Sequence, residues 1–378
     1  MKVRGAVLRE MGLPAPYAES RPLEIAELEL DAPGENELLV KVGAAGLCHS
    51  DLSVIDGSRP RAMPMVLGHE AAGEVVGVGP SPDGFEVGDH VILAFVPACG
   101  GCEPCRTGRA ALCDRGAAAN VAGEMLGGGR RWHPLDQGTD MNHHLGVSAF
   151  AEHIVVSTRS AVKVDPSLPH EIAALFGCAV LTGVGAVVNS AQVRMGDSVA
   201  VFGLGGVGLA ALLGARLAGA SKIVAVDVVQ DKLDLARELG ATDVVLAGGD
   251  GTVEDVRLAA GGAGADEVIE TVGNADVLAD AYAATKRGGV TVTVGLPHPS
   301  KTLSIPAVSL VAEERTLRGS YLGSCVPTVD LPRYVELYKA GRLPVDRLLT
   351  HRIELDDINE GFDRLARGQA VRQAVVFS

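Results

Sequence analysis

The chain has 378 residues, of which 47% are hydrophobic and 21% are charged. A chain of this length usually forms more than one domain, and its apolar content is sufficient for two cores. The formal net charge of −14 argues against a general binder of nucleic acids or anionic membranes, because contacts to phosphate require Lys and Arg.

The N-terminal stretch MKVRGAVLREMG contains no long apolar run followed by a small-residue cleavage site. Elsewhere, no stretch approaches twenty apolar residues without a Gly or a charge that interrupts it. We therefore expect neither export nor a membrane anchor, and we expect the protein in the cytoplasm.

The first 180 residues favour short antiparallel strands. ELLVKVGAAGLC (37–48), AGEVVGVGP (72–80) and GDHVILAF (88–95) are Val-rich runs with some alternation, bounded by Gly, Pro or Asp. This pattern predicts a β-rich first domain.

Two motifs in this region carry candidate metal ligands. GLCHSD (46–51) contains Cys48, and GHE (68–70) contains His69. With Cys178 from FGCAVLTGVGAV they supply two thiolates and an imidazole, which leave a fourth zinc position open, as a catalytic site requires. Taken alone, Cys48 could equally be a small buried residue, Asp51 a helix cap and His69 a core histidine.

Four further cysteines are crowded into fifteen residues. Their gaps of two, two and seven residues suit a closed tetrahedral zinc site of the structural kind, formed by Cys99, Cys102, Cys105 and Cys113. A redox pair would leave two cysteines unexplained, and an iron–sulfur cluster is the weaker alternative. A nucleic-acid-binding zinc ribbon would need a basic background, which this chain lacks.

Residues 114–142 form a long connection rich in Gly, Ala and Arg, and it holds the single tryptophan, Trp132. Connections of this length are usually functional or mobile.

From about residue 180 the chain alternates buried strands with helices, which predicts a parallel sheet built from βαβ units. FGLGGVG places Gly203, Gly205 and Gly208 in a G-x-G-x-x-G frame between a strand and a helix. Asp227 ends the next strand, where it would bind the ribose hydroxyls of NAD and repel the 2′-phosphate of NADP. No Arg follows it at 228–230. A glycine-rich turn without a ligand is the alternative.

After about residue 321 the chain returns to helix, strand, helix and a final strand, AVRQAVVF (370–377). We interpret this block as completing the first domain. The fold class is therefore α/β, with a doubly wound parallel sheet of the Rossmann type and a β-rich domain.

Taken together and in order, these motifs resemble those of the zinc-dependent alcohol dehydrogenases of the medium-chain dehydrogenase/reductase family, over essentially the whole chain. The quoted motifs are GLCHSDL, GHEAAGEVVGVG, GDHVI, the four-cysteine lobe, HHLGVSAFAEH, GCAVLTGVGAV, VFGLGGVG, INEGFDRLARG and VRQAVVF. The resemblance implies a GroES-like catalytic domain at 1–179 and 322–378, which surrounds an NAD-binding Rossmann domain at 180–321.

The resemblance also implies residue roles. Cys48, His69 and Cys178 would bind catalytic zinc, with Glu70 close to the metal. Asp51 would orient His69. Ser50 would accept the alcohol proton. Many relatives pass that proton to a His three residues further on, but here the residue is Ser53, so His49, water or a shorter path must serve.

For the coenzyme, His49 and Arg372 match positions that contact the pyrophosphate. Lys232 matches a residue near the adenosine ribose, and Thr182 matches one near the nicotinamide. The remaining positions expected to bind NAD are Gly203, Gly205, Gly206, Val207, Gly208, Asp227, Val272 and Val294.

The substrate pocket would include Ser50, Phe95 and Leu145. His143 and His144 are adjacent on an extended segment and point to opposite faces, so we interpret them as structural or as shaping the pocket. Cys325 has no motif and is expected to be structural or a free thiol.

The predicted function is zinc-dependent, NAD-linked, reversible oxidation of primary aliphatic or aromatic alcohols, with two zinc ions per chain. One alternative is oxidation of S-(hydroxymethyl)glutathione or a similar thiol adduct of formaldehyde. Another, of a different class, is a non-catalytic NAD-binding protein. A zinc-free reductase of the same superfamily should lack Cys48, His69 and the four-cysteine lobe. The long loop favours a homodimer over a homotetramer.

Overall fold

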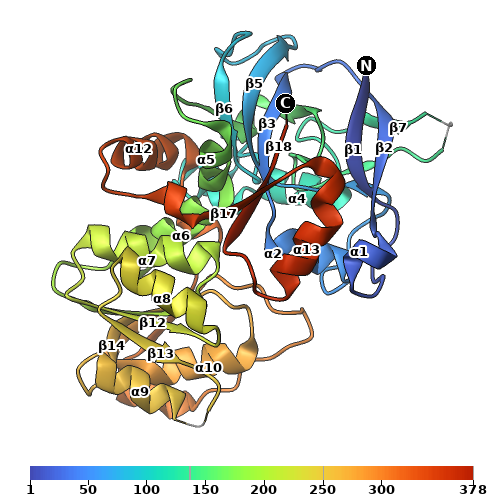
Figure 1. Cartoon of the computed structure of the whole chain (residues 1–378). Helices are drawn as coiled ribbons and strands as arrows, with labels where there is room; N and C mark the ends of the chain where they lie inside the picture. Colours follow the sequence, from blue (N-terminus) through green and yellow to red (C-terminus); the bar gives the residue numbers. More distant parts are fainter. Residues whose placement is uncertain (136–137, 250, 378) are drawn as a thin grey trace. The chain divides into compact units, whose positions relative to one another are not determined.

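The structure is a computed structural model that describes residues 1–135, 138–249 and 251–377. The chain divides into two compact units (Figure 1). Unit 1 comprises Met1–Cys178, Val326–Val335 and Leu349–Ser378, and unit 2 comprises Ala179–Cys325 and Glu336–Leu348. The domain limits expected from the sequence, 1–179 with 322–378 and 180–321, stay a prediction.

Unit 1 is built mainly of antiparallel strands. Its strands are β1 (Lys2–Leu8), β2 (Leu23–Leu30), β3 (Glu37–Gly46), β4 (Met65–Val66), β5 (Glu70–Val78), β6 (His90–Leu93), β7 (Trp132–Pro134), β8 (Asn142–His143), β9 (His153–Ser157), β10 (Ala161–Lys163), β17 (Leu349–Ile353) and β18 (Arg372–Val376). Its helices are α1 (Tyr17–Ser20), α2 (His49–Ile55), α3 (Glu103–Arg106), α4 (Asp114–Ala122), α5 (His170–Leu175) and α13 (Ile358–Ala366), and α12 (Pro327–Lys339) belongs partly to each unit.

These strands form two sheets. One has the order β7-β2-β1-β4-β8, and the other has the path β10-β6-β5-β3-β18-β17, with β9 also paired to β3. The C-terminal strand β18 lies antiparallel to β3, more than 300 residues away in the sequence, so the end of the chain is part of the same sheet as the strand that leads into GLCHSD.

Unit 2 contains a six-stranded parallel sheet of order β13-β12-β11-β14-β15-β16. The strands are β11 (Ser198–Phe202), β12 (Lys222–Asp227), β13 (Asp243–Leu246), β14 (Ala265–Glu270), β15 (Thr285–Thr293) and β16 (Thr316–Gly319). The helices are α6 (Leu181–Gly185), α7 (Gly206–Ala218), α8 (Gln230–Leu239), α9 (Thr252–Ala259), α10 (Ala275–Ala284) and α11 (Ala307–Ala312). Figure 1 shows α7 and α8 on one face and α9 and α10 on the other, which confirms the predicted α/β class with a doubly wound sheet.

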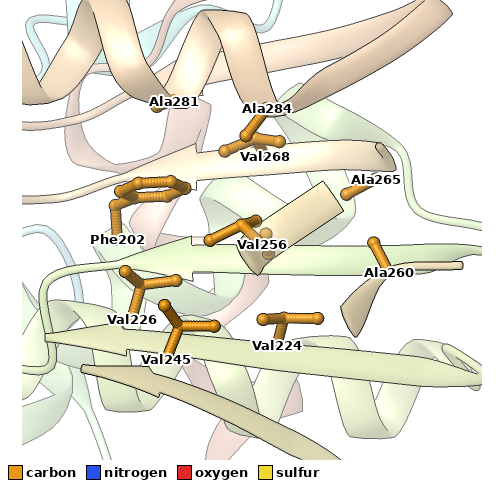
Figure 2. Close-up of a cluster of buried hydrophobic side chains, with 11 residues drawn as sticks. Phe202, Val224, Val226, Val245, Val256, Ala260, Ala265, Val268, Ala281 and Ala284 are labelled. Atoms are coloured by element: carbon orange, nitrogen blue, oxygen red, sulfur yellow. The ribbon is translucent and has the colours of Figure 1, made fainter. Parts of the chain in front are cut away.

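One buried cluster of unit 2, on the face of the sheet that packs against α9 and α10, is made almost entirely of Val and Ala. The cluster contains Phe202 as its one ring, among side chains such as Val224, Val226, Val256 and Val268 (Figure 2). Small side chains let the helices approach the sheet closely. Phe202 ends the strand that leads into the glycine-rich turn, so this cluster supports that turn.

One helical stretch, His170–Ala191, is long and apolar enough to cross a membrane by length and composition, with a mean hydropathy of 2.0. The most apolar 18-residue segment of this stretch is 89% buried inside the structure, so the stretch has the character of a core helix.

The long connection 114–142 is part of unit 1 and contacts other segments of that unit at several points. It contains α4 and β7, and Trp132 is fully buried. The Arg131 guanidinium binds both carboxylate oxygens of buried Glu37, with Nε–Oε2 and Nη2–Oε1 distances of 2.8 and 2.9 Å. Such a bidentate pair restrains the chain strongly. Residues 136 and 137 lie outside the described residues.

His133 joins this connection to Asp31 through contacts whose strength depends on pH. Its Nδ1 lies 2.8 Å from Asp140 and its Nε2 lies 2.9 Å from Asp31, and both carboxylates raise the pKa of the imidazole. A group with a raised folded pKa stabilises the fold fully below its unfolded pKa of about 6.5 and loses that contribution as the pH rises through the folded value.

We therefore predict that His133→Gln lowers the Tm most below pH ~6.5 and has little effect in alkaline buffer. The measurement is a series of thermal melts of both proteins across pH. Because the side chain is about one-third exposed, solvent will weaken the effect. A difference in Tm that grows with rising pH would contradict the assignment.

Candidate active site

The turn between β3 and α2 carries the first metal-ligand candidate. Cys48 is the residue that precedes α2, and Asp51 Oδ2 accepts a hydrogen bond from the Cys48 backbone N–H at 3.3 Å. Asp51 therefore does cap the helix, as its position after Cys48 allowed. This contact also fixes the backbone that carries the Cys48 thiol.

The other oxygen of Asp51 reaches the second candidate. Oδ1 lies 3.0 Å from His69 Nδ1 and accepts from the Gly68 backbone N–H at 3.3 Å. With Nδ1 bound to Asp51, His69 keeps Nε2 for a metal ion, the arrangement typical of zinc-bound histidines. Burial by itself would raise the pKa of Asp51, but the rings of His69 and His144 hold it below its usual value.

Cys48, His69 and Cys178 meet in one buried cluster within unit 1. Their ligand atoms all lie within 4.8 Å of one another, although the three residues span 130 positions of the sequence. A hydrogen bond from Cys178 holds the pKa of the Cys48 thiol well below its ordinary value against the effect of burial, and Arg372 and His69 add to this. Two sulfurs and one imidazole nitrogen in this arrangement fit zinc with an open position.

Glu70 and Arg372 adjoin this cluster. Both are buried, and Arg372 Nη1 lies 3.7 Å from Glu70 Oε2 and donates to the carbonyl of Leu47 at 3.1 Å. Although burial opposes the charge, Glu70, Cys48 and Cys178 raise the pKa of the guanidinium. Arg372 is therefore a cation that compensates the negative charge of the carboxylate and the thiolates here. The sequence predicts for it only a contact with the coenzyme pyrophosphate.

Two glycines of the motifs create the space for this cluster. Gly46 lies opposite Glu70 in the pairing of β3 with β5, and a Cβ at Gly46 would meet Glu70 Oε1 at 2.2 Å. Gly68 has φ +94°, and its Cβ would meet the Phe150 backbone nitrogen at 2.7 Å. Only glycine suits these two places, which explains why GLCHSD and GHE begin as they do.

The four remaining candidates form a separate lobe. The ligand atoms of Cys99, Cys102, Cys105 and Cys113 also lie within 4.8 Å of one another. The Cys105 backbone N–H is the main cause that lowers the Cys102 pKa to about 6, which favours the thiolate that binds metal. The Cys113 sulfur accepts N–H donors from Cys99 and Gly116 at 3.2 and 3.3 Å. Four converging sulfurs fit a closed zinc site.

The other catalytic and pocket candidates lie in α2, just after β6 and just after β8. Ser50 is half-buried in the first turn of α2, and His49 is exposed beside it. The Ser53 hydroxyl donates to the His49 carbonyl at 2.9 Å, so it is engaged inside the helix. The ring of Phe95 meets His69 edge-on with centroids 5.3 Å apart, and Leu145 is buried with φ +52°.

The two adjacent histidines have different partners, as predicted for an extended segment. His143 Nε2 accepts from the Arg131 backbone N–H at 3.1 Å, and burial lowers its pKa to about 3. These contacts are in keeping with the structural role that was one of the two interpretations of His143. His144 Nε2 lies 3.2 Å from Asp51 Oδ1, and no sequence motif indicated that contact.

The glycine-rich turn lies between β11 and α7 in unit 2. Gly203 has φ +87°, and a Cβ at Gly208 would meet the Gly203 carbonyl oxygen at 1.8 Å. The backbone thus approaches helix α7 as closely as a dinucleotide turn requires, and the N-terminus of α7 favours a pyrophosphate.

Asp227, the residue at the end of β12 that the sequence predicts to bind the ribose, has two backbone partners. It accepts from the backbone N–H groups of Leu204 and Val229 at 2.7 and 3.0 Å, so it joins the glycine-rich turn to the start of α8. Lys232 lies half-buried in α8.

Glu270, which the sequence analysis did not single out, holds the loop that carries the candidate residue Val272. Buried at the end of β14, it accepts from the N–H groups of Val272 and Gly273 at 2.6 and 2.7 Å, while Thr293 donates to its other oxygen. It thereby shapes the loop that carries Val272. Its place after a buried strand, at the edge of the sheet that carries the glycine-rich turn, is the signal that could have found it.

The remaining candidates of unit 2 differ in their burial and in their place in the chain. Val272 is exposed, and Thr182 and Val294 are half-buried. Gly205 immediately precedes α7, whose first residues are Gly206 and Val207. The thiol of Cys325 is buried and lies 3.4 Å from the Leu181 carbonyl, in keeping with a structural role.

Two regions of the chain match known families. Residues 34–166 match the alcohol dehydrogenase GroES-like domain, and residues 206–340 match the zinc-binding dehydrogenase family. The chain is 41% identical to the putative alcohol dehydrogenase D of Mycobacterium tuberculosis, with 100% of both chains covered. It is 40% identical to the NDMA-dependent alcohol dehydrogenase of Amycolatopsis methanolica, again with 100% of both covered. It is 38% identical to S-(hydroxymethyl)glutathione dehydrogenase of Escherichia coli, covering 99% of this chain and 100% of that one.

Two solved structures agree with these relatives. A zinc-binding domain protein of the alcohol dehydrogenase type from Burkholderia ambifaria has a TM-score of 0.93 at 36% identity and covers 100% of this chain and 99% of its own. Benzyl alcohol dehydrogenase from Acinetobacter calcoaceticus has a TM-score of 0.91 at 31% identity, with 100% of both chains covered.

The fold and these matches define a zinc-dependent oxidoreductase with a GroES-like and a Rossmann-like part. The chain belongs to the zinc-dependent alcohol dehydrogenases of the medium-chain dehydrogenase/reductase family. It is an alcohol-oxidising enzyme that uses zinc and a nicotinamide cofactor.

We predict that the two cysteine clusters bind metal independently. Cys48→Ala should remove one zinc per chain and the alcohol activity while leaving NADH binding intact. Cys105→Ala should remove the other zinc and lower the Tm, because a structural zinc contributes directly to folding. Zinc content by atomic emission checks both variants. A Cys48→Ala protein with full zinc content and activity would refute the assignment.

Proposed function

We propose that this enzyme oxidises primary aliphatic or aromatic alcohols to aldehydes, reversibly and with NAD, and that it binds two zinc ions per chain. The observation that carries the proposal is the convergence of Cys48, His69 and Cys178, with Asp51 behind the imidazole. This ligand set would hold the catalytic zinc, and the four-cysteine lobe would hold the structural one.

When bound, zinc lowers the pKa of the alcohol as a Lewis acid and NAD accepts the hydride. The residues of the chain supply the rest. Ser50 accepts the proton of the alcohol. Asp51 keeps His69 oriented, and Arg372 offsets the negative charge of Glu70 and the two thiolates. Phe95 and Leu145 give the site an apolar lining that excludes water.

We propose that the proton leaves Ser50 by way of His49 or water. The Ser53 hydroxyl is a donor to the His49 carbonyl, so it is engaged where many relatives have a histidine. His49 is exposed and adjacent to Ser50, which supports this exit. It would also contact the coenzyme pyrophosphate, as would Arg372.

The aromatic-alcohol substrate is supported by the fold's similarity to benzyl alcohol dehydrogenase from Acinetobacter calcoaceticus. A second candidate is a thiol adduct of formaldehyde, supported by 38% identity to S-(hydroxymethyl)glutathione dehydrogenase of Escherichia coli. A non-catalytic NAD-binding role is disfavoured, because the chain carries a full set of candidate ligands and a proton acceptor.

NAD rather than NADP is supported by Asp227 at the end of β12, because an acidic residue at the end of the second strand binds the ribose hydroxyls of NAD and repels the 2′-phosphate of NADP. The half-buried Lys232 would lie near the adenosine ribose, Thr182 near the nicotinamide, and Val272 and Val294 would complete the site.

We propose a cytoplasmic homodimer. Among the described residues, strand β16 is the last strand of the parallel sheet, and an unpaired sheet edge is a surface with which a second copy could pair. Helix α11, which precedes β16 in the chain, exposes Val308 and Val311 to 71% and 81%, which supports an apolar contact with a second copy.

The function is tested by steady-state kinetics with NAD on a panel of ethanol, 1-butanol, benzyl alcohol and S-(hydroxymethyl)glutathione. We expect the highest kcat/KM for a primary aliphatic or aromatic alcohol and background rates for His69→Ala. If the glutathione adduct were the best substrate, the second candidate would replace the first. Equal rates for the parent and His69→Ala would contradict both.

The coenzyme proposal is tested by replacement of Asp227. Asp227→Gly should weaken NADH binding and relax the preference towards NADPH. Asp227→Asn is the matched variant, because it keeps the size of the side chain and an acceptor for one of the two backbone N–H groups, while it removes the charge. Loss of one charge-assisted hydrogen bond corresponds to about 10-fold in Kd. Fluorescence titration gives the Kd of each coenzyme, and an unchanged ratio of the two would refute the role of the carboxylate.

A further inference from the structure

The ring of His144 lies beside the candidate metal ligand His69, inside the protein. The pairing of β4 with β8 sets Val66 opposite His143, so the residues that follow each strand come close together. The rings of His69 and His144 meet edge-on, with centroids 5.7 Å apart and an interplanar angle of 73°. Both side chains are almost fully buried.

The closest polar group to His144 is the carboxylate that orients His69. Nε2 of His144 lies 3.2 Å from Asp51 Oδ1, the same oxygen that lies 3.0 Å from His69 Nδ1. This His144–Asp51 contact is a polar contact rather than a hydrogen bond of regular geometry. Among the described residues, neither ring nitrogen of His144 has another hydrogen-bond partner. Asp51 is therefore the polar partner of the His144 imidazole among the described residues.

The backbone holds His144 in this position. Its N–H donates to the Ser148 hydroxyl at 2.8 Å, and its carbonyl accepts from Val147 and Ser148 at 3.0 and 3.1 Å. Leu145 and Ser148 both have positive φ values in this turn. Such a closed turn fixes the backbone from which the imidazole projects.

We propose that His144 is a positioning residue, which holds the Asp51 carboxylate in place and, through it, the metal-binding ring of His69. Asp51 already accepts from Cys48 and Gly68 on the chain segments that carry the ligands, and His144 supplies a contact from a third segment. In a buried site a polar contact to a carboxylate is stronger than in water. Substitution of a residue that hydrogen-bonds to a zinc ligand typically lowers metal affinity or activity 10–100-fold.

The inference rests on the proposed role of Cys48, His69 and Cys178 as zinc ligands, and the test measures metal loss directly. His144→Phe keeps an aromatic ring and removes the polar contact, while His144→Gln restores a donor near the position of Nε2. The readout is the rate of zinc transfer to a chromogenic chelator. Zinc should leave the two sites in two kinetic phases. The phase that Cys48→Ala lacks belongs to the catalytic site, and the remaining phase belongs to the four-cysteine lobe.

We expect His144→Phe to speed this phase about 10-fold and His144→Gln to restore most of the parent rate. The cobalt-substituted enzyme should show a shifted visible absorption for His144→Phe only. With an alcohol substrate, kcat should fall more than KM changes, because the residue acts through the metal ligand.

His143→Phe is the matched control, since His143 is the neighbouring buried histidine and binds the Arg131 backbone instead of Asp51. It should lower the Tm and leave zinc release unchanged. Equal acceleration in both variants would overturn the proposal, because it would reveal only a weakened segment. A raised KM with unchanged zinc release and cobalt spectrum would overturn it as well, in favour of a direct substrate contact. If no phase were absent in Cys48→Ala, the proposed zinc site itself would fail.

Discussion

The buried carboxylate of Asp51 is the interaction on which the candidate active site depends. Its two oxygens accept from the backbone of Cys48 and Gly68 and bind the ring of His69. A buried charge is costly unless it is hydrogen-bonded, so the surrounding segments are held where they satisfy it. The carboxylate thus aligns two candidate metal ligands, from the start of α2 and the start of β5, that no local structure would bring together.

The same physical device recurs in unit 2. Asp227 accepts backbone N–H groups from the glycine-rich turn and from the start of α8, and Glu270 accepts those of the loop after β14. Each carboxylate ends a strand and fixes the loop that follows or adjoins it. Loops at the carboxyl edge of a parallel sheet form ligand sites, and buried acceptors give such loops a defined shape before a coenzyme arrives.

Close approach of backbones is the second constraint. Gly46 and Gly68 leave room for the Glu70 carboxylate and for the chain near Phe150, and Gly208 leaves room for the Gly203 carbonyl. The buried cation Arg372 comes from β18, near the C-terminus, so the pairing of that strand with β3 places a positive charge beside Glu70.

The sequence by itself determined the parts whose information is local: the α/β class, the glycine-rich turn between a strand and a helix, and the family to which the motifs belong. Spacing alone also grouped Cys99, Cys102, Cys105 and Cys113, which the fold brings together. Only the tertiary structure decided the contact of His144 with Asp51, the loop held by Glu270 and the anchoring of Arg131 on Glu37. The reason is that these partners are neither at a fixed spacing nor in a recurring motif, so strand register and packing, not local pattern, select them.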